Sequence, residues 1–189
     1  MVMILFSYFV GAIPTGYIIS KYVYGIDIQS KGSGNIGATN MTRILGKKVG
    51  ALTLAIDLLK SFFMIGWVIW AGQSPNILAL SCVALLLGNC FSVFLKGKGG
   101  KGVATSFGIY LALSPTLFFM GVLVYGLSLK LTKISAVGSL AVMTVWPLAA
   151  FFIFDTKILI YMSFVLSALG ILRHRKNILA FYKKKPIFK

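Results

Sequence analysis

Acidic side chains are almost absent from this 189-residue sequence, which has no glutamate and only three aspartates, Asp27, Asp57 and Asp155. It also has one histidine and two cysteines. Familiar zinc and two-metal sites need several such ligands close together, so we expect neither a metal nor a cofactor. Cys82 and Cys90 lie within one apolar segment, so they are predicted to be small buried hydrophobic residues rather than a disulfide framework.

Basic residues are abundant by contrast, because 19 lysines and arginines give the chain a formal net charge of +16. Such a charge can indicate nucleic-acid binding. The chain is also 58% hydrophobic, with a mean hydropathy of +0.92, which is typical of an integral membrane protein. Cytoplasmic loops of such proteins are enriched in Lys and Arg, so we predict no nucleic-acid partner. These loops would lie against anionic lipid and attract anionic substrates.

Long apolar runs predict the membrane-spanning helices, each of which needs about 20 mainly apolar residues. The 27 charge-free residues at 103–129 could form one long helix or two short ones. Proline cannot continue a helical hydrogen-bond ladder, so we place a break at Ser114-Pro115. The predicted spans are 1–20, 50–71, 77–95, 102–113, 115–130, 134–154 and 157–172.

The predicted fold is all-α, a single domain over residues 1–189 with about seven membrane-spanning helices and a basic tail at 178–189. The break at Ser114 puts most basic residues on one side of the membrane. We assign that side to the cytoplasm, which leaves the N-terminus outside and the C-terminus inside. The helix at 102–113 would rise only about 17 Å, roughly half the hydrocarbon thickness.

Two glycine-rich basic stretches interrupt the apolar chain, Lys31–Asn40 (KGSGNIGATN) and Lys96–Gly102 (KGKGGKG). Glycine lets backbone N–H groups turn inward and approach an anion, and lysine adds positive charge. The second stretch leads into the short helix, whose N-terminus carries free N–H groups and a partial positive charge. Together the stretches predict a site for one or more phosphates at the membrane surface.

Two nucleotide-binding motifs are excluded for these stretches. The first matches G-x-G-x-x-G, but no strand precedes it and no βαβ unit follows. The second lacks the lysine that a P-loop requires at its end. A flexible surface loop or a set of helix caps remains the simpler alternative. The phosphate site is favoured by the polar residues crowded among the glycines, which are Ser33, Asn35, Thr39, Asn40 and Arg43.

Two charged residues lie inside the second predicted span. Asp57 and Lys60 are three residues apart and so share one helical face. Bare charges are costly in lipid, so the pair should face the interior of the bundle. We favour a structural ion pair over direct catalysis, although Lys60 could also face the site from one turn below the surface.

The single histidine, His174, lies in a basic sequence at the end of the last span. Histidine exchanges protons near neutral pH, so His174 is either a general base or an interfacial residue in a basic cluster. Neighbouring cations should lower its pKa and favour the neutral form that a base needs. Asn177 could share its helical face. No Ser-His-carboxylate or Cys-His arrangement is evident, which argues against an acyl-enzyme.

These motifs resemble those of the bacterial glycerol-3-phosphate acyltransferases that use acyl phosphate as donor. The first motif matches at Gly32–Asn40, Arg43, Gly46, Gly50, Thr53-Leu54, Asp57 and Lys60. The second matches at Lys98–Thr105, and the third matches at His174-Arg175 and Asn177-Ile178.

The sequence departs from the family pattern in three regions. Asn89 and Ser92 stand where the family usually has a histidine and a proline, and Lys96-Gly97 replaces Gly-Phe. In the third motif Lys176 replaces a common acidic residue, and the tail lacks the usual Arg-Leu-x-x-Gly-x-Glu pattern. These departures concern the packing near Asn89 and the C-terminal end, and they leave the expected reactive centre intact.

The resemblance implies transfer of an acyl chain from acyl phosphate to the 1-hydroxyl of sn-glycerol 3-phosphate, giving lysophosphatidic acid and phosphate for phospholipid synthesis. It implies a multi-pass protein of the bacterial plasma membrane with its active site on the cytoplasmic side. The implied partners are membrane lipid and the soluble phosphate acyltransferase that supplies acyl phosphate. Since acyl phosphate is an activated mixed anhydride, the hydroxyl can attack directly without an acyl-enzyme.

The resemblance also assigns the phosphates of both substrates to residues of this sequence. Ser33, Asn35 and Arg43 would hold the donor phosphate, while Lys101 and the second glycine stretch would hold glycerol 3-phosphate. The predicted substrate-binding residues are Gly32, Gly34, Asn35, Gly37, Thr39, Asn40, Lys60, Lys98, Gly99, Gly100 and Gly102.

His174 and Asn177 would orient the acceptor hydroxyl or accept its proton, although a phosphate of the substrates could be the base instead. The predicted catalytic residues are Ser33, Arg43, Lys101, His174 and Asn177. Two other functions remain open. A transporter or channel for an anionic solute could use the half-length helix, and a non-catalytic relative of the family could bind anionic lipid.

Overall fold

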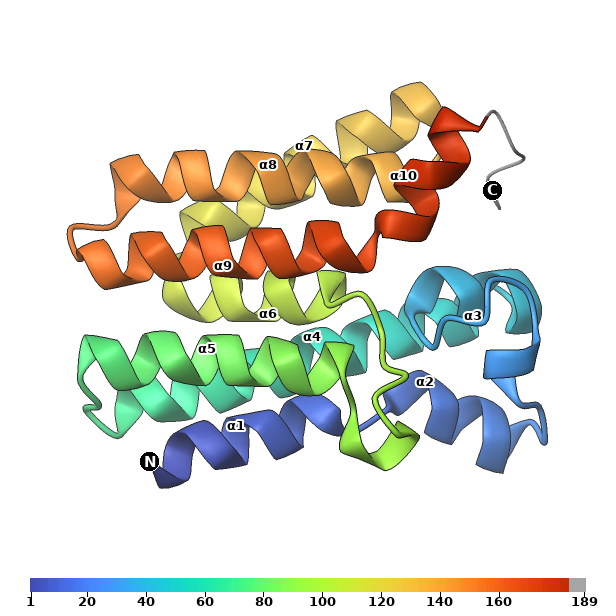
Figure 1. Cartoon of the computed structure of the whole chain (residues 1–189), viewed down its shortest axis with the longest axis horizontal. Helices are drawn as coiled ribbons and strands as arrows, with labels where there is room; N and C mark the ends of the chain where they lie inside the picture. Colours follow the sequence, from blue (N-terminus) through green and yellow to red (C-terminus); the bar gives the residue numbers. More distant parts are fainter. Residues whose placement is uncertain (184–189) are drawn as a thin grey trace.

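The structure is a computed structural model that describes residues 1–183 and consists of packed helices (Figure 1). No β-strand occurs within these residues, which confirms the all-α prediction. The α-helices are α1 Val2–Ala12, α2 Thr15–Ile18, α3 Ala38–Leu45, α4 Lys47–Trp70, α5 Pro75–Cys90, α6 Val103–Leu113, α7 Pro115–Thr132, α8 Ser135–Ile153, α9 Lys157–Arg173 and α10 Arg175–Tyr182. A π-helical turn, Ile19–Val23, and two 3₁₀ turns, Ile28–Ser30 and Val93–Leu95, complete the helical segments.

Several of these helices have the length and composition of membrane spans. Five segments of residues 1–183 qualify, and they are Val2–Val23, Lys47–Trp70, Pro75–Leu95, Pro115–Thr132 and Ser135–Ile153. A sixth is formed if α9 and α10, which meet at a bend of 56°, are taken as one broken span. The predicted span at 102–113 is α6, which is apolar but has only 11 residues. Helix length therefore supports five or six spans and leaves the count of about seven unestablished.

The predicted break of the long apolar run is present. The backbone of Ser114 is extended, and α7 begins with Pro115 as its first helical residue. Ser114 also caps α7, because its Oγ accepts a hydrogen bond of 3.4 Å from the backbone N–H of Leu117. Proline fits the first turn of a helix, where its missing N–H is not needed. This junction separates the short α6 from α7.

Other predicted boundaries need correction. The span at 1–20 is interrupted at Pro14, and the span at 77–95 ends as an α-helix at Cys90. Helix α3 lies within the stretch that the sequence indicated only as polar, because its few apolar residues form one face packed on α4. Residues 178–182 of the predicted tail belong to α10. The remainder of the tail, 184–189, lies outside the described residues.

The ion pair predicted within the second span holds the break between α1 and α2. Lys60 Nζ lies 2.7 Å from Asp57 Oδ1 and donates a hydrogen bond of 2.7 Å to the carbonyl of Ile13. Thr15 Oγ1, on the other side of the break, donates a 2.7 Å hydrogen bond to Asp57 Oδ1. Pro14 cannot donate to the α1 ladder, so these contacts satisfy carbonyls that the helix leaves free.

Small residues let neighbouring helices approach closely. A Cβ built on Gly11 would collide with the carbonyl of Leu85, and one on Gly88 would collide with the carbonyl of Tyr8, where α1 packs on α5. Gly108 of α6 lies in the same way against the carbonyl of Leu58 on α4. Small residues at such crossings are typical of membrane helices, whose association depends on close van der Waals packing.

Both glycine stretches lie toward the same end of the bundle. In Figure 1 the chain from α2 to α3, the loop before α6, and α10 gather at one end, while the N-terminus lies at the other. The bundle thereby places segments from three distant parts of the sequence beside one another, at the ends of the helices.

The ion pair at the α1–α2 break gives a test of the fold. Removing one partner of a buried ion pair leaves an uncompensated charge and typically destabilises a protein by about 3–5 kcal/mol. We expect Lys60→Met to lower the thermal unfolding temperature in detergent clearly, whereas Lys157→Met, at an exposed position, should leave it unchanged. Adding Asp57→Asn to Lys60→Met should restore part of the loss. Equal unfolding temperatures for Lys60→Met and the parent would contradict this role.

Candidate active site

The first glycine stretch is folded around the side chain of Asn40, which is 2% exposed. Its Nδ2 donates hydrogen bonds to the carbonyls of Lys31 (3.1 Å) and Asn35 (2.9 Å). Its Oδ1 accepts from the backbone N–H of Ser33 (3.0 Å) and from Nη1 of Arg43 (3.1 Å). The amide of Asn40 is thus fully used within the loop, so the structure gives it a shaping role rather than an open face for substrate.

The rest of this stretch follows from that arrangement. Gly32 and Gly34 adopt φ values of +57° and +69°, in the left-handed region that glycine enters without strain. The side chain of Asn35 accepts a 2.8 Å hydrogen bond from the N–H of Gly37, which tightens the turn into α3. Ser33 stays exposed at the tip of the loop.

Arg173, at the end of α9, binds backbone carbonyls of the second glycine stretch. Arg173 Nε donates to the carbonyl of Gly100 and Nη2 donates to that of Gly99, each at 3.0 Å. The guanidinium also lies over the ring of Phe91, 5.0 Å from its centroid. Arg173 was not among the predicted site residues, although its position beside His174 in the basic sequence was the available signal.

Backbone packing fixes the second stretch further. The N–H of Gly100 donates a 2.8 Å hydrogen bond to the carbonyl of Asn89, so this N–H is not free to meet an anion. A Cβ on Gly99 would collide with that same carbonyl, so only glycine fits there. Ser92 Oγ donates a 2.6 Å hydrogen bond to the carbonyl of Ala12, which anchors the start of the loop to α1. Asn89 and Ser92 therefore both have packing partners.

The two glycine stretches are linked directly. Gln29 Nε2, just before the first stretch, donates a 3.0 Å hydrogen bond to the carbonyl of Lys98 in the second. Gln29 was not among the predicted site residues, and nothing in its local sequence indicated this contact. Lys98 itself is exposed.

Lys101 joins the second stretch to α10. Its Nζ donates a 2.6 Å hydrogen bond to Oδ1 of Asn177. The pKa of Lys101 is lowered to about 8, chiefly by burial and additionally by the nearby positive charges of Arg173 and Arg43. Arg43, Lys101 and Arg173, from three separate parts of the chain, thus form one group of cations, which we call the cation cluster.

His174 lies beside the cation cluster with 2% of its surface exposed. Its Nδ1 lies 2.8 Å from the carbonyl of Gly170, and since a carbonyl only accepts, Nδ1 carries the proton and Nε2 of the neutral ring has a lone pair. The pKa of His174 is lowered to about 4, chiefly by burial; the Gly170 hydrogen bond opposes this, and Lys101 and Arg173 add to it. From the sequence, only the neighbouring cations were expected to lower the pKa of His174.

Two predicted binding residues have partners elsewhere. The contacts of Lys60 lie at the α1–α2 break, so the structure does not bring it into the cation cluster. Thr39 Oγ1 lies 3.1 Å from Ser135 Oγ, which is 2.8 Å from the hydroxyl of Tyr125. This chain of hydroxyls ties α3 to α7 and α8. Among residues 1–183 no three histidine, cysteine or acidic side chains gather as metal ligands would.

The packed apolar helices and the cationic site at one end define an integral membrane protein with a surface site suited to anions. A family model described as glycerol-3-phosphate acyltransferase matches residues 1–184, and the chain belongs to that family. The resemblance identified from the motifs is thereby confirmed.

The relatives agree over nearly the whole chain. A glycerol-3-phosphate acyltransferase of Trichlorobacter lovleyi is 40% identical over 174 residues, covering 91% of this chain and 88% of the relative. One of Bacillus subtilis is 40% identical over 176 residues, covering 93% of this chain and 90% of the relative.

Solved structures of one membrane enzyme also match this fold over nearly the whole chain. The crystal structure of PlsY (YgiH), an integral membrane glycerol 3-phosphate acyltransferase, in its glycerol 3-phosphate form gives a TM-score of 0.94 at 33% identity. That match covers 100% of this chain and 94% of the other. The lysophosphatidic acid form of PlsY gives 0.92 at 34% identity, covering 99% and 93%.

The pair of hydrogen bonds from Arg173 to the carbonyls of Gly99 and Gly100, which we call the Arg173 clamp, can be tested without changing the net charge. Lysine cannot reach two carbonyls in the forked manner of a guanidinium. A hydrogen bond from a charged group contributes about 1.5–3 kcal/mol, so we expect Arg173→Lys to reduce kcat/KM for glycerol 3-phosphate roughly 10–100-fold. Arg175→Lys serves as the control, because Arg175 is the exposed first residue of α10, and this variant should retain activity. Similar kinetics for both variants would exclude the clamp.

Proposed function

We propose that the protein transfers an acyl chain from acyl phosphate to the 1-hydroxyl of sn-glycerol 3-phosphate in one step, giving lysophosphatidic acid and phosphate. The observation that carries this proposal is the convergence of both glycine stretches and α10 on the cation cluster next to His174. Both substrates carry a phosphate, and a site at the ends of membrane helices can admit a lipid tail from the bilayer and a polar head group from water.

The proposed step forms one bond and breaks one. The glycerol oxygen attacks the acyl carbonyl carbon, the bond from that carbon to the phosphate oxygen breaks, and the phosphate leaves with both bonding electrons. Ser33, Arg43 and N–H groups of the first stretch hold the donor phosphate, and Lys101 with the second stretch holds glycerol 3-phosphate. Fixed positive charge close to the phosphate stabilises it as it leaves.

The hydroxyl proton must pass to a base during this attack. A pKa of about 4 makes the neutral ring of His174 a weak proton acceptor, whereas a phosphate monoester has a second pKa near 6. We therefore infer that a substrate phosphate takes the proton, while His174 Nε2 and Asn177 accept or donate the hydrogen bonds that orient the hydroxyl. The Gly170 carbonyl keeps the ring in the required tautomer.

The placement in the membrane is part of the same proposal. All seven predicted segments would cross or enter the bilayer as one acyltransferase domain, with the N-terminus outside and the site on the cytoplasmic side of a bacterial plasma membrane. The excess of Lys and Arg near both glycine stretches and α10 supports this orientation. Membrane lipid would surround the protein, and acyl phosphate would come from the soluble phosphate acyltransferase that makes it.

The reaction is tested with purified protein in detergent or lipid cubic phase. We expect palmitoyl phosphate to release phosphate only when glycerol 3-phosphate is present, with an equal amount of lysophosphatidic acid. Saturable binding of either substrate without any release would contradict the enzyme. It would favour the anion transporter, which liposome uptake of unchanged glycerol 3-phosphate would reveal, or the non-catalytic relative.

Titration of Lys101 predicts the alkaline limb of the pH profile. Its pKa is lowered to about 8, so the ammonium that holds phosphate is present below that pH and is lost above it. We expect kcat/KM for glycerol 3-phosphate to fall as pH rises through about 8. Lys101→Arg stays charged, so its decline should move to higher pH. Identical alkaline limbs in Lys101→Arg and the parent would contradict the assignment.

The role of His174 is tested by His174→Gln, whose amide can reach the position of Nε2. General base catalysis typically supplies about 10²–10⁴-fold in rate. If His174 only orients the hydroxyl, the variant should keep more than about a tenth of the parent kcat. A loss of 10²-fold or more, with an unchanged unfolding temperature, would instead make His174 the base.

A further inference from the structure

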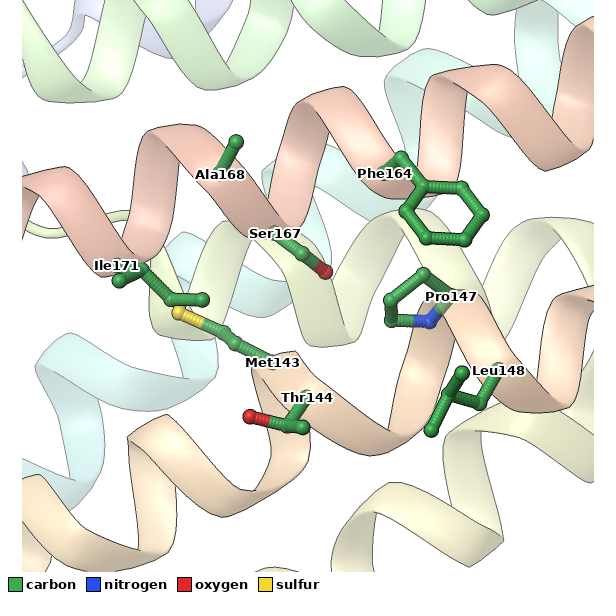
Figure 2. A pocket seen from close by; sticks show the side chains of 8 residues that line it. All are labelled: Met143, Thr144, Pro147, Leu148, Phe164, Ser167, Ala168 and Ile171. Atoms are coloured by element: carbon green, nitrogen blue, oxygen red, sulfur yellow. The ribbon is translucent and has the colours of Figure 1, made fainter.

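A groove of about 300 Å³ lies between α8 and α9, and no residue of either glycine stretch lines it (Figure 2). Its floor includes the buried side chains of Met143 and Ser167, and its rim includes Leu148 and Phe164, which are 57% and 49% exposed. A groove with an apolar, exposed rim on membrane helices opens sideways toward the acyl chains of the bilayer. In a membrane, lipid acyl chains would therefore contact this groove.

The groove also contains a polar feature that hydrocarbon alone would leave unsatisfied. The hydroxyl of Ser167 has no hydrogen-bond partner, although the residue is only 5% exposed. Figure 2 shows its oxygen turned into the groove, toward Pro147. Buried hydroxyls are normally hydrogen-bonded, so an unpaired one that faces a groove indicates a ligand with an acceptor group.

Basic residues follow the groove-lining part of α9 in the sequence. Ile171 is its last lining residue on α9, and Arg175 and Lys176 follow at the exposed start of α10. Ser167 lies six residues before the end of α9, about 9 Å along that helix, and α10 then leaves at a bend of 56°. The long side chains of Arg175 and Lys176 would cover the remaining separation. Glycerophospholipids have the same order of groups, because an ester carbonyl lies between the phosphate and the acyl chain.

We propose that the groove binds one anionic glycerophospholipid of the surrounding bilayer. One acyl chain fills the space between α8 and α9, an ester carbonyl accepts a hydrogen bond from Ser167, and the phosphate pairs with Arg175 or Lys176. The apolar lining, the unpaired hydroxyl and the adjacent positive charge each match one part of this ligand.

Occupancy of the groove is coupled to the active site through one glycine. A Cβ built on Gly170 would collide with Sδ and Cε of Met143, so the floor of the groove packs directly on Gly170. The carbonyl of Gly170 in turn fixes the ring of His174. A chain that presses on Met143 therefore holds His174 in place. This regulatory step rests on the proposed function, whereas lipid binding does not.

The binding site is tested by photocrosslinking in zwitterionic nanodiscs. Phosphatidylglycerol and phosphatidylcholine, each with a diazirine in the acyl chain, are added separately, and labelled residues are mapped by mass spectrometry. We expect phosphatidylglycerol to label the groove several-fold more than phosphatidylcholine does. At Phe119, which is 65% exposed on α7, the two lipids should label equally.

Two matched variants of α9 provide the controls. Ala168→Phe fills the groove from its exposed rim and should abolish the preference for phosphatidylglycerol, whereas Val165→Phe adds the same bulk outside the groove and should keep it. The same nanodiscs report kcat for acyl transfer, which phosphatidylglycerol should raise several-fold in the parent and in Val165→Phe but not in Ala168→Phe.

Other outcomes overturn this inference. Equal labelling of the groove by the two lipids would refute the anionic lipid site, and so would displacement of the label by a non-hydrolysable palmitoyl phosphonate, because the groove would then hold the donor chain. Selective labelling without acyl transfer in any lipid would refute the proposed function while leaving the lipid site in place.

Discussion

Mutual repulsion of the cation cluster is the constraint on which the rest of the site depends. Burial lowers the pKa of Lys101 most, and the charges of Arg173 and Arg43 lie close enough to lower it as well. The same burial removes much of the water that would screen these charges. Neutral acceptors hold these cations in place. The carbonyls of Gly99 and Gly100 receive Arg173, and side-chain amides receive Arg43 and Lys101. In the proposed reaction, an arriving phosphate would relieve this repulsion by interacting with all three charges.

The same surroundings determine the state of the histidine. Burial beside Lys101 and Arg173 keeps the His174 ring neutral, and the Gly170 carbonyl selects the tautomer with a lone pair on Nε2. A charged imidazole would add to the repulsion, whereas a neutral one can orient a hydroxyl. Catalysis in such a site depends on positions fixed before substrate arrives, and the close helix contacts at glycine provide that rigidity.

Much of this arrangement could be predicted from the sequence, because membrane helices and proline breaks have strong local signals. The all-α fold, the break at Ser114 and the Asp57–Lys60 ion pair follow from apolar runs, one proline and a spacing of three residues. Helix α3 could not be predicted in this way, because its eight residues are too few to establish a helical period and they lie within a polar stretch.

The contacts within the site were harder to predict, since they depend on segments far apart in the chain. Arg173 and Gln29 donate to backbone carbonyls, which every residue has. The basic sequence around His174 could therefore point to Arg173 but not to its partners. The position of Asn40 among glycines indicated a polar loop but not that its amide is used internally. Lys60 had two possible orientations on its helix, and only the packing of α1 decided between them.

The central claim is that the cation cluster receives the phosphate of the acceptor, and proton uptake on binding tests it most directly. Glycerol 3-phosphate is titrated calorimetrically into the purified protein at pH 8 in buffers of different ionisation heat. Near its pKa of about 8, Lys101 is partly deprotonated, and a bound dianion should raise that pKa. The account predicts uptake of up to roughly half a proton per site in the parent and none in Lys101→Arg. Binding heats that do not depend on the buffer in the parent would contradict it.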